Sequence, residues 1–399
     1  MFVANGLGGP SFLPRLPERQ ADLGLSDAGL GVVLAGMAAG ALAASPVAGR
    51  AVGWVGSRPV VVAAALTLAA SLWTAGAAPE PVVLFLALAL VGAADASMDI
   101  AMNANGAAYE RRSGRSVMHR LHGAWSLGAL AGAGLAAAAA GLGVSLTWQL
   151  VTVGVVIAAG VLRSRTGLVA DDSHPADRTA AAARPATDAA PTGRNGEVMA
   201  TARRWRVGPL VVLGAATVGG AIIEGAPSDW SAIRLERLGT GPGAAALGFA
   251  AFMTGMLLGR LVGDHLTDRF GGGAVLRGGM ALVAGGLVAG AVVDHPAVFA
   301  VGLVLVGVGA SGLFPLAFAA AGNTPGVAPG AGAATVSLAA RIGFLVEPLV
   351  MGALAQLLGL RWAFVVVAGV ALAVAAAAGR IIPRASRLVD GTVTDVRAV

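Results

Sequence analysis

The sequence contains no cysteine and no lysine, and it has few aromatic residues. Without cysteine, disulfides, thiolate metal sites and cysteine nucleophiles are excluded. All 27 basic residues are arginine, and aromatic residues make up only 5% of the chain. The net charge of +6 is spread over many segments rather than forming a basic stripe interleaved with aromatic residues, which is the pattern of nucleic-acid binding. We therefore expect no nucleic-acid partner.

The common motifs of soluble enzymes are also missing. The sequence has no phosphate-binding G-x-x-x-x-G-K-[ST], no H-E-x-x-H and no G-x-S-x-G, which excludes the nucleotide, zinc-protease and serine-hydrolase sites that these motifs form. We expect neither enzymatic activity nor a cofactor. Any work that the protein does must draw on an ion gradient or on the gradient of its own substrate.

Charged residues are scarce, whereas apolar residues are abundant. Charged residues form 12% of the chain and hydrophobic residues 56%, with a mean hydropathy of +0.79, while a soluble domain has about 25% charged residues. The 60 glycines suit helices that pack closely in lipid. The composition predicts an all-α integral membrane protein.

Apolar runs long enough to cross a bilayer divide the chain into twelve expected spans, the first of them abbreviated. A polar segment at residues 164–206, expected to be a disordered cytoplasmic linker, separates a six-helix bundle at 1–163 from a second at 207–380, and 381–399 form a tail. A Leu-Ser-Asp sequence at 25–27 predicts an N-cap at the start of the second span. The expected spans are residues 1–13, 28–46, 60–77, 81 to about 110, 121–140, 146–162, 207–226, 243–262, 273–293, 298–321, 331–357 and 362–378.

The distribution of arginine predicts the orientation in the membrane. If both termini lie inside, the cytoplasmic segments hold most of the arginines, as the positive-inside rule requires. The protein is then a multi-pass protein of the plasma (cytoplasmic) membrane with both termini in the cytoplasm. The outer loops would hold only Arg15, Arg19, Arg234, Arg237 and Arg361.

Polar residues recur every four positions in the fourth span. Asp95, Asp99 and Asn103 share one narrow stripe of a helix, and this stripe must face protein or water. Carboxylates at this depth mark substrate pathways and proton relays. The alternative for both aspartates is a static pair with an arginine from a neighbouring span, and Asn103 also fits a hydrogen-bonding role near the helix end.

Four further polar residues are candidates for the same site. Glu224 lies between glycines and ahead of Pro227, so we expect the seventh span to loosen there and expose Glu224 to a central cavity, unless Glu224 only caps the break. Arg341 and Glu347 lie six residues apart and face different sides of one helix; each needs another partner, most simply an opposite charge. His122 begins the fifth span and fits either a proton role or interfacial packing.

The two sets of six spans carry degraded copies of a known motif. The turn after the second span keeps Gly49, Gly56 and Arg58 of a G-x-x-x-D-R-x-G-R-R pattern, with Gly53 and Trp54 where an acid and a base would stand. In these features the chain resembles the major facilitator superfamily of secondary transporters, and the resemblance implies a charge latch at the cytoplasmic helix ends. The turn after the eighth span keeps more of the pattern, with Gly259, Arg260, Gly263, Asp264, Asp268, Arg269 and Gly271.

Within that superfamily, the chain resembles a bacterial branch that is itself distantly similar to fucose-permease-like transporters. The segments that carry this similarity are residues 99–110, 122–128, 11–17, 224–231 and 312–315. The resemblance implies two pseudo-symmetric bundles that rock around a central site, but it names no substrate.

We therefore expect a secondary transporter that works by alternating access, coupled to protons by symport or antiport. The polar stripe fits uptake of a sugar-like solute, and the largely aliphatic walls fit efflux of an amphiphilic compound. A transporter-like sensor is the third possibility if the short first span is complete. The expected partners are the lipid bilayer, a small-molecule substrate and protons, and the protein is expected to be a monomer.

Overall fold

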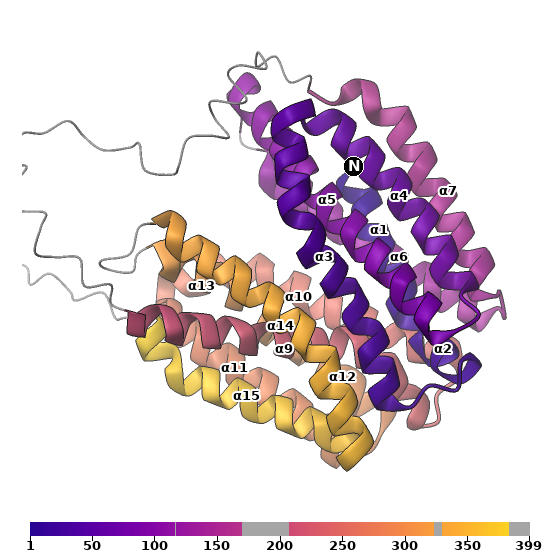
Figure 1. Cartoon of the computed structure of the whole chain (residues 1–399). Coiled ribbons are helices and arrows are strands. Elements are labelled where there is room, and N and C mark those ends of the chain that lie inside the picture. Colours follow the sequence, from indigo (N-terminus) through magenta and orange to yellow (C-terminus); the bar gives the residue numbers. More distant parts are fainter. Residues whose placement is uncertain (116, 170–206, 323–328, 383–399) are drawn as a thin grey trace, which may run out of the picture.

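In the computed structural model, every regular element of the described residues is a helix (Figure 1). The structure describes residues 1–115, 117–169, 207–322 and 329–382. Within these ranges, eleven helices are long and apolar enough to cross a membrane. The expected all-α membrane fold is confirmed.

The helices form two bundles with the same internal arrangement. In the first, helix α1 packs on α6, α3 on α5, and α4 on α7; in the second, α9 packs on α14, α10 on α12, and α11 on α15. The first bundle comprises α1 (Phe2–Phe12), α3 (Asp27–Val55), α4 (Ser57–Ala77), α5 (Pro81–Ser113), α6 (Met118–Gly141) and α7 (Leu146–Ser164). The second comprises α9 (Val207–Arg237), α10 (Pro242–Phe270), α11 (Gly272–Val292), α12 (Pro296–Ala310), α13 (Leu313–Gly322), α14 (Pro329–Leu358) and α15 (Leu360–Ile381).

The start of the chain differs from the expectation in one respect. Helix α1 is short, as expected, but the segment after it is not an irregular connection, because it folds into the 3-10 helix η1 (Leu13–Arg15) and the helix α2 (Leu16–Asp22). The predicted N-cap is confirmed, since the Ser26 hydroxyl accepts a hydrogen bond from the Gly29 amide at 3.1 Å. Most of the expected linker and tail, residues 170–206 and 383–399, lies outside the described residues.

The span that is interrupted is the tenth, whereas we predicted an interruption of the seventh. Helix α9 runs unbroken through Glu224 and Pro227 to Arg237, so the expectation of a loosened seventh span was wrong. The tenth span, which we expected to be continuous, is instead divided at Ser311 and Gly312 into α12 and α13. A proline inside a long, well-packed helix leaves one carbonyl without its helical donor, and neighbouring helices can compensate for that loss.

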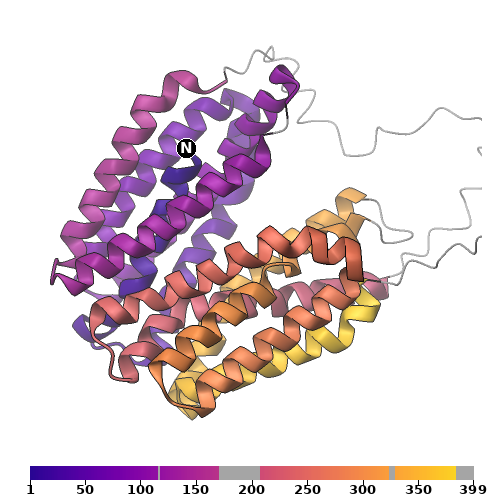
Figure 2. The same cartoon turned by 180° about the vertical axis from the view of Figure 1, so that it is seen from behind.

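The two bundles touch at one end and diverge at the other (Figures 1 and 2). We call the end from which α7 leads to α9 the linker end, and the opposite end, where α2 lies, the far end. At the far end a Cβ on Gly31 of α3 would lie 2.1 Å from the carbonyl oxygen of Pro348 in α14. A Cβ on Gly243 of α10 would lie 2.9 Å from Cα of Gly141 in α6. Small residues thus bring the bundles into backbone contact at the far end.

Candidate functional site

Asp95 belongs to a hydrogen-bonded network that joins three helices of the first bundle. Asn5 on α1 donates from Nδ2 to Asp95 Oδ1 on α5 at 2.8 Å. Trp125 on α6 donates from Nε1 to Asn5 Oδ1, also at 2.8 Å. Asn5 is 3% exposed, and both its side-chain oxygen and its side-chain nitrogen are hydrogen-bonded. Because the oxygen accepts from Trp125, the nitrogen faces the Asp95 carboxylate.

Close packing of α1 on α6 fixes this network. A Cβ on Gly6 would lie 2.2 Å from the Trp125 carbonyl oxygen, and one on Gly128 would lie 2.3 Å from the Val3 carbonyl oxygen. The two helices therefore meet backbone to backbone beside Asn5. The glycines around Asn5 position the asparagine.

Asp99 is the exposed member of the stripe on α5. Asn103 donates to Asp99 Oδ1 at 2.8 Å and to its carbonyl oxygen at 2.9 Å. Two cationic or titratable groups act on the Asp99 carboxylate through space, namely His122 of α6 and Arg341 of α14. The Phe2 ring packs edge-on against His122, with 5.5 Å between the ring centroids.

Arg341, near the middle of α14, connects the two bundles. Its Nη1 donates to Ser45 Oγ on α3 at 2.6 Å and approaches the Ala41 carbonyl oxygen at 3.5 Å. The hydrogen-bonding partner of Arg341 is thus a neutral hydroxyl of the second span and not the opposite charge that we expected as the simplest partner. With Asp99 nearby, the guanidinium places a positive charge of the second bundle against the polar face of the first.

Glu347 also departs from the expectation of matched charges. Its side chain is 1% exposed and lies within hydrogen-bonding range of Asp229 on α9. The partner of this buried acid is therefore a second acid and not a base. Arg341 and Glu347 do face different neighbours, as their spacing predicted.

Glu224 is half-buried on the unbroken α9. The charge that acts on it through space is Arg260 of α10, a residue of the second motif copy. Because the helix does not break, Glu224 caps no interruption. It lies on α9 between the linker end and Asp229, apart from the Asp95 network.

The residues of the expected latch are not paired with one another. Gly56 (φ +89°) and Gly271 (φ +81°) are single-residue corners after α3 and α10, and such φ values favour glycine. A Cβ on Gly49 would have no neighbour within 4 Å. Within the described ranges, Arg58, Asp264 and Asp268 take part in no ion pair, and Arg269 lies over the Phe270 ring at 5.4 Å.

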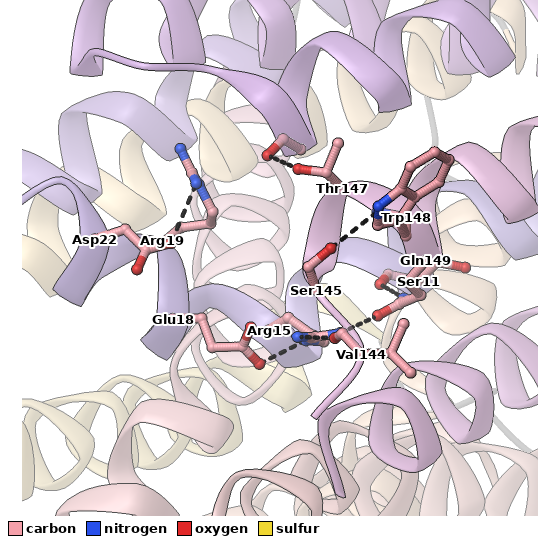
Figure 3. A network of polar contacts seen from close by, with 11 residues as sticks. Ser11, Arg15, Glu18, Arg19, Asp22, Val144, Ser145, Thr147, Trp148 and Gln149 are labelled. Carbon is pink, nitrogen blue, oxygen red and sulfur yellow. Dashed lines mark hydrogen bonds and ion pairs between the residues drawn. The ribbon is translucent and has the colours of Figure 1, made fainter. Parts of the chain in front are cut away.

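A second polar network at the far end was not anticipated from the sequence (Figure 3). Arg15, 3% exposed, donates to Gln149 Oε1 at 2.7 Å and to the Val144 carbonyl oxygen at 2.8 Å, and its Nε donates to Glu18 at 2.6 Å. Gln149 in turn donates to the Ser11 carbonyl oxygen at 2.7 Å. This network ties η1 and α2 to α7.

The same end carries an ion pair between the bundles. Arg237 of α9 pairs with Asp27 of α3, with one Nη1–Oδ2 contact of 3.1 Å. Gln20 of α2 donates to the same carboxylate at 2.7 Å. The far end is thus closed by backbone contact and by charge.

Sequence reasoning missed three residues that contact the predicted site. From the sequence, we predicted no site role for Trp125, Ser45 or Asp229. Trp125 lies three residues after His122 on α6 and therefore on nearly the same helical face, which is the only signal in the sequence that would have drawn attention to it. Ser45 has no such signal, because its role depends on a helix of the other bundle.

Comparisons with known proteins agree with this architecture. Residues 230–393 match the family model described as Major Facilitator Superfamily. The chain is 31% identical to an uncharacterized MFS-type transporter of Yersinia pestis over 94% of this chain and 93% of that protein.

Two solved structures share the fold. The nucleoside transporter NupG superposes with a TM-score of 0.74 at 13% identity, over 95% of this chain and 97% of that chain. A bacterial homolog of the human lysosomal transporter Spinster, in an inward-facing and occupied conformation, superposes with a TM-score of 0.70 at 14% identity, over 95% and 94%. The likeness to fucose-permease-like transporters stays a prediction. The chain is a multi-pass membrane transporter rather than an enzyme, and it belongs to the Major Facilitator Superfamily.

Proposed function

We propose that this protein is a proton-coupled transporter of a small polar solute that works by alternating access in a bacterial plasma membrane. The linker end faces the cytoplasm, as the arginine distribution favours. The solute binds between the bundles, against the polar face that Asp95, Asp99 and Trp125 form on one side and Arg341 on the other.

The observation that carries this proposal is the meeting of polar groups from both bundles near the middles of α5 and α14. The Asp95 network belongs to the first bundle, while Arg341 reaches Ser45 from the second. A solute that bridges these groups would interact differently with the two bundles as they rock, which is the condition for coupling binding to a conformational change. The hydrogen-bonding groups favour a polar solute over an amphiphilic one.

The distribution of contacts supports alternating access. The bundles meet at the far end through Gly31, Gly243 and the Asp27–Arg237 pair, and they diverge at the linker end (Figure 1). With the linker end in the cytoplasm, this is the inward-facing conformation. Rocking to the outward-facing conformation would separate these contacts and bring the latch residues together.

Asp95 supports coupling to protons. The groups that act on its carboxyl are Asn5 and Asp99. Neither carries a positive charge, so a charge on Asp95 has no direct counter-ion among the described residues. A carboxylate in such a setting in the membrane exchanges a proton more readily than it keeps a fixed charge.

The test is a proton-flux measurement with purified protein in lightly buffered proteoliposomes. Sugars, organic acids, hydrophobic drugs and nucleosides, the last because NupG is a nucleoside transporter, are added in turn while the internal pH is recorded. We expect one class of polar compound to trigger a proton flux. Asp95→Asn should abolish uphill transport, because the amide cannot exchange a proton, while exchange of solute down its gradient persists.

Glu80→Gln is the matched control, since Glu80 is an exposed acid at the N-cap of the same helix, and it should transport normally. Normal uphill accumulation by Asp95→Asn would remove Asp95 from the coupling mechanism. A flux triggered only by hydrophobic drugs would replace uptake of a polar solute by efflux of amphiphilic compounds.

A further inference from the structure

The second bundle contains a pair of acids that the Asp95 site does not use. Asp229 of α9 and Glu347 of α14 lie within hydrogen-bonding range of each other. Glu347 is 1% exposed, and its neighbour Trp230 is fully buried. Two carboxylates this close cannot both hold a charge away from water, and the usual solution is one shared proton.

The backbone of α9 is shaped to receive Glu347. A Cβ on Gly225 would lie 2.8 Å from both Cγ and Cδ of Glu347 and 2.9 Å from Oε2. Any larger residue at 225 would displace the Glu347 side chain. Glycine at this position allows the carboxyl to lie directly against the helix that carries Asp229.

Two buried polar atoms at the pair make no hydrogen bond. They are Glu347 Oε1 and Trp230 Nε1, and the Trp230 indole lies close enough to the Glu347 carboxyl for its N–H to stabilise the ionised form. Buried polar groups are rarely left without a partner. We expect an unpaired acceptor beside an N–H donor where a carboxyl alternates between a protonated and an ionised form. The hydrogen bonds of such a carboxyl change with its charge.

Among the residues that the structure describes, no arginine or histidine forms an ion pair with Asp229 or Glu347. The charged groups on α9 and the neighbouring helices have other partners. Arg234 and Arg237 of α9 pair with Asp294 and Asp27. Arg260 of α10 acts on Glu224, and Arg361 of α15 pairs with Asp294. Arg341 of α14 is bonded to Ser45. Charge compensation at Asp229 and Glu347 must therefore come from a bound cation, and the smallest one that fits between two carboxyls in hydrogen-bonding range is a proton.

We propose that Asp229 and Glu347 form a proton-binding site that holds one proton between them and that this proton keeps the far end closed. The proposal rests on the alternating access proposed above. Binding takes one proton from water into the pair, and release returns it to water and leaves two like charges on α9 and α14. Their repulsion would then push the two helices apart.

The geometry links this separation to the contact between the bundles. Pro348 follows Glu347 directly, and its carbonyl oxygen is the atom that lies against Gly31 of α3. Asp27 begins α3 and pairs with Arg237 at the end of α9. Any shift of α14 relative to α9 at Glu347 is therefore transmitted to both contacts that close the far end.

The absence of cysteine makes a direct test practical, because two introduced cysteines can be spin-labelled without a background. Val82, near the start of α5, and Leu357, near the end of α14, are both exposed at the far end. The distance between spin labels at these two positions, measured by pulsed electron paramagnetic resonance in lipid nanodiscs, reports the separation of the bundles at the far end. Labels at Val55 and Phe270 report the linker end. Both distances are followed from about pH 5 to about pH 9, a range in which a buried acid pair can release its proton.

We expect the far-end distance to lengthen and the linker-end distance to shorten as the pH rises. Glu347→Gln and Asp229→Asn, which are neutral at every pH, should lose this response and stay closed at the far end. Glu80→Gln should retain it. Trp230→Phe, which removes the N–H that stabilises the charged form, should move the midpoint to higher pH.

An unchanged pH response in both neutral variants would overturn the proposal. A response to sodium at constant pH would also overturn it, since the bound cation would then not be a proton. If the neutral variants do not fold, infrared spectroscopy of the wild type and of Trp230→Phe decides: the proposal requires a protonated-carboxyl band whose pH midpoint moves with the indole removed. The experiment needs no substrate. Its outcome can therefore be distinguished from a failure to find the transport activity proposed above.

Discussion

The arginines at the two ends of the molecule differ in their ion pairing. All five arginines expected in outer loops take part in ion pairs at the far end, with Glu18, Asp22, Asp27 or Asp294 as partners. At the linker end, within the described ranges, none of Arg50, Arg58, Arg269, Arg277 and Arg380 belongs to an ion pair. The far end therefore has specific contacts to break, whereas the linker end has charges still available to form them.

This difference explains how one sequence can favour two conformations. Contacts that close one end must be weak enough to break when those at the other end form. Backbone contact at Gly31 and one partly exposed ion pair meet this condition better than a large apolar interface would. The comparison predicts that substitutions at the far end shift the equilibrium, while those at the linker end leave the present conformation unchanged.

The largest effect is expected from Gly31→Ala. The new Cβ would lie 2.1 Å from the Pro348 carbonyl oxygen, and such overpacking costs about 1–3 kcal/mol. Because separating the bundles relieves the clash, the far-end distance between spin labels should lengthen and transport should fall. Gly40→Ala is the control: its clash is with Ala89 in the same bundle, so it should lower the melting temperature without changing the far-end distance. An identical response of both variants would contradict the proposed role of Gly31.

A smaller effect is expected from Asp27→Asn and Arg237→Gln. The two side chains are 12% and 37% exposed, and a partly exposed ion pair contributes about 1 kcal/mol, which is about a fivefold change in population. Each single variant should open the far end slightly, and the double variant should do no more than either alone. High salt should reproduce the effect in the wild type. Additive effects of the two substitutions would show that the residues act independently.

The smallest effect is expected from Asp264→Asn at the linker end. Asp264 takes part in no ion pair in the described part of the chain, so the melting temperature of the far-end-closed conformation should change by less than the equivalent of about 0.5 kcal/mol. Transport should nevertheless slow if Asp264 forms the latch in the other conformation. Unchanged transport together with unchanged stability would remove Asp264 from the latch.

Much of the candidate site was accessible from the sequence, because it depends on periodicity within one helix. Asp95, Asp99 and Asn103 share a face of α5 by spacing alone, and the structure keeps them on that face. The partners were not accessible in the same way. Asn5, Trp125 and Ser45 are far from α5 in the sequence, and no rule of spacing relates residues on different helices.

Two of the expectations that failed have a common physical cause. We predicted a loosened helix at Glu224 from a nearby proline. We predicted an opposite charge beside Glu347 because a buried acid needs a partner. Both predictions rested on local chemistry alone. Helix α9 stays intact because it is packed along its length, and Glu347 meets Asp229 because Gly225 lets α14 approach α9. Packing between helices decided both.

The sequence by itself determined the membrane class, the approximate positions of the apolar spans and the shared face of the polar residues on α5, because hydropathy and helical periodicity are local properties. Only the tertiary structure decided which helices meet, which end is closed and which acids become neighbours. Those outcomes depend on close approach of backbones at a few glycines, and a difference of one small side chain there changes which helices can touch.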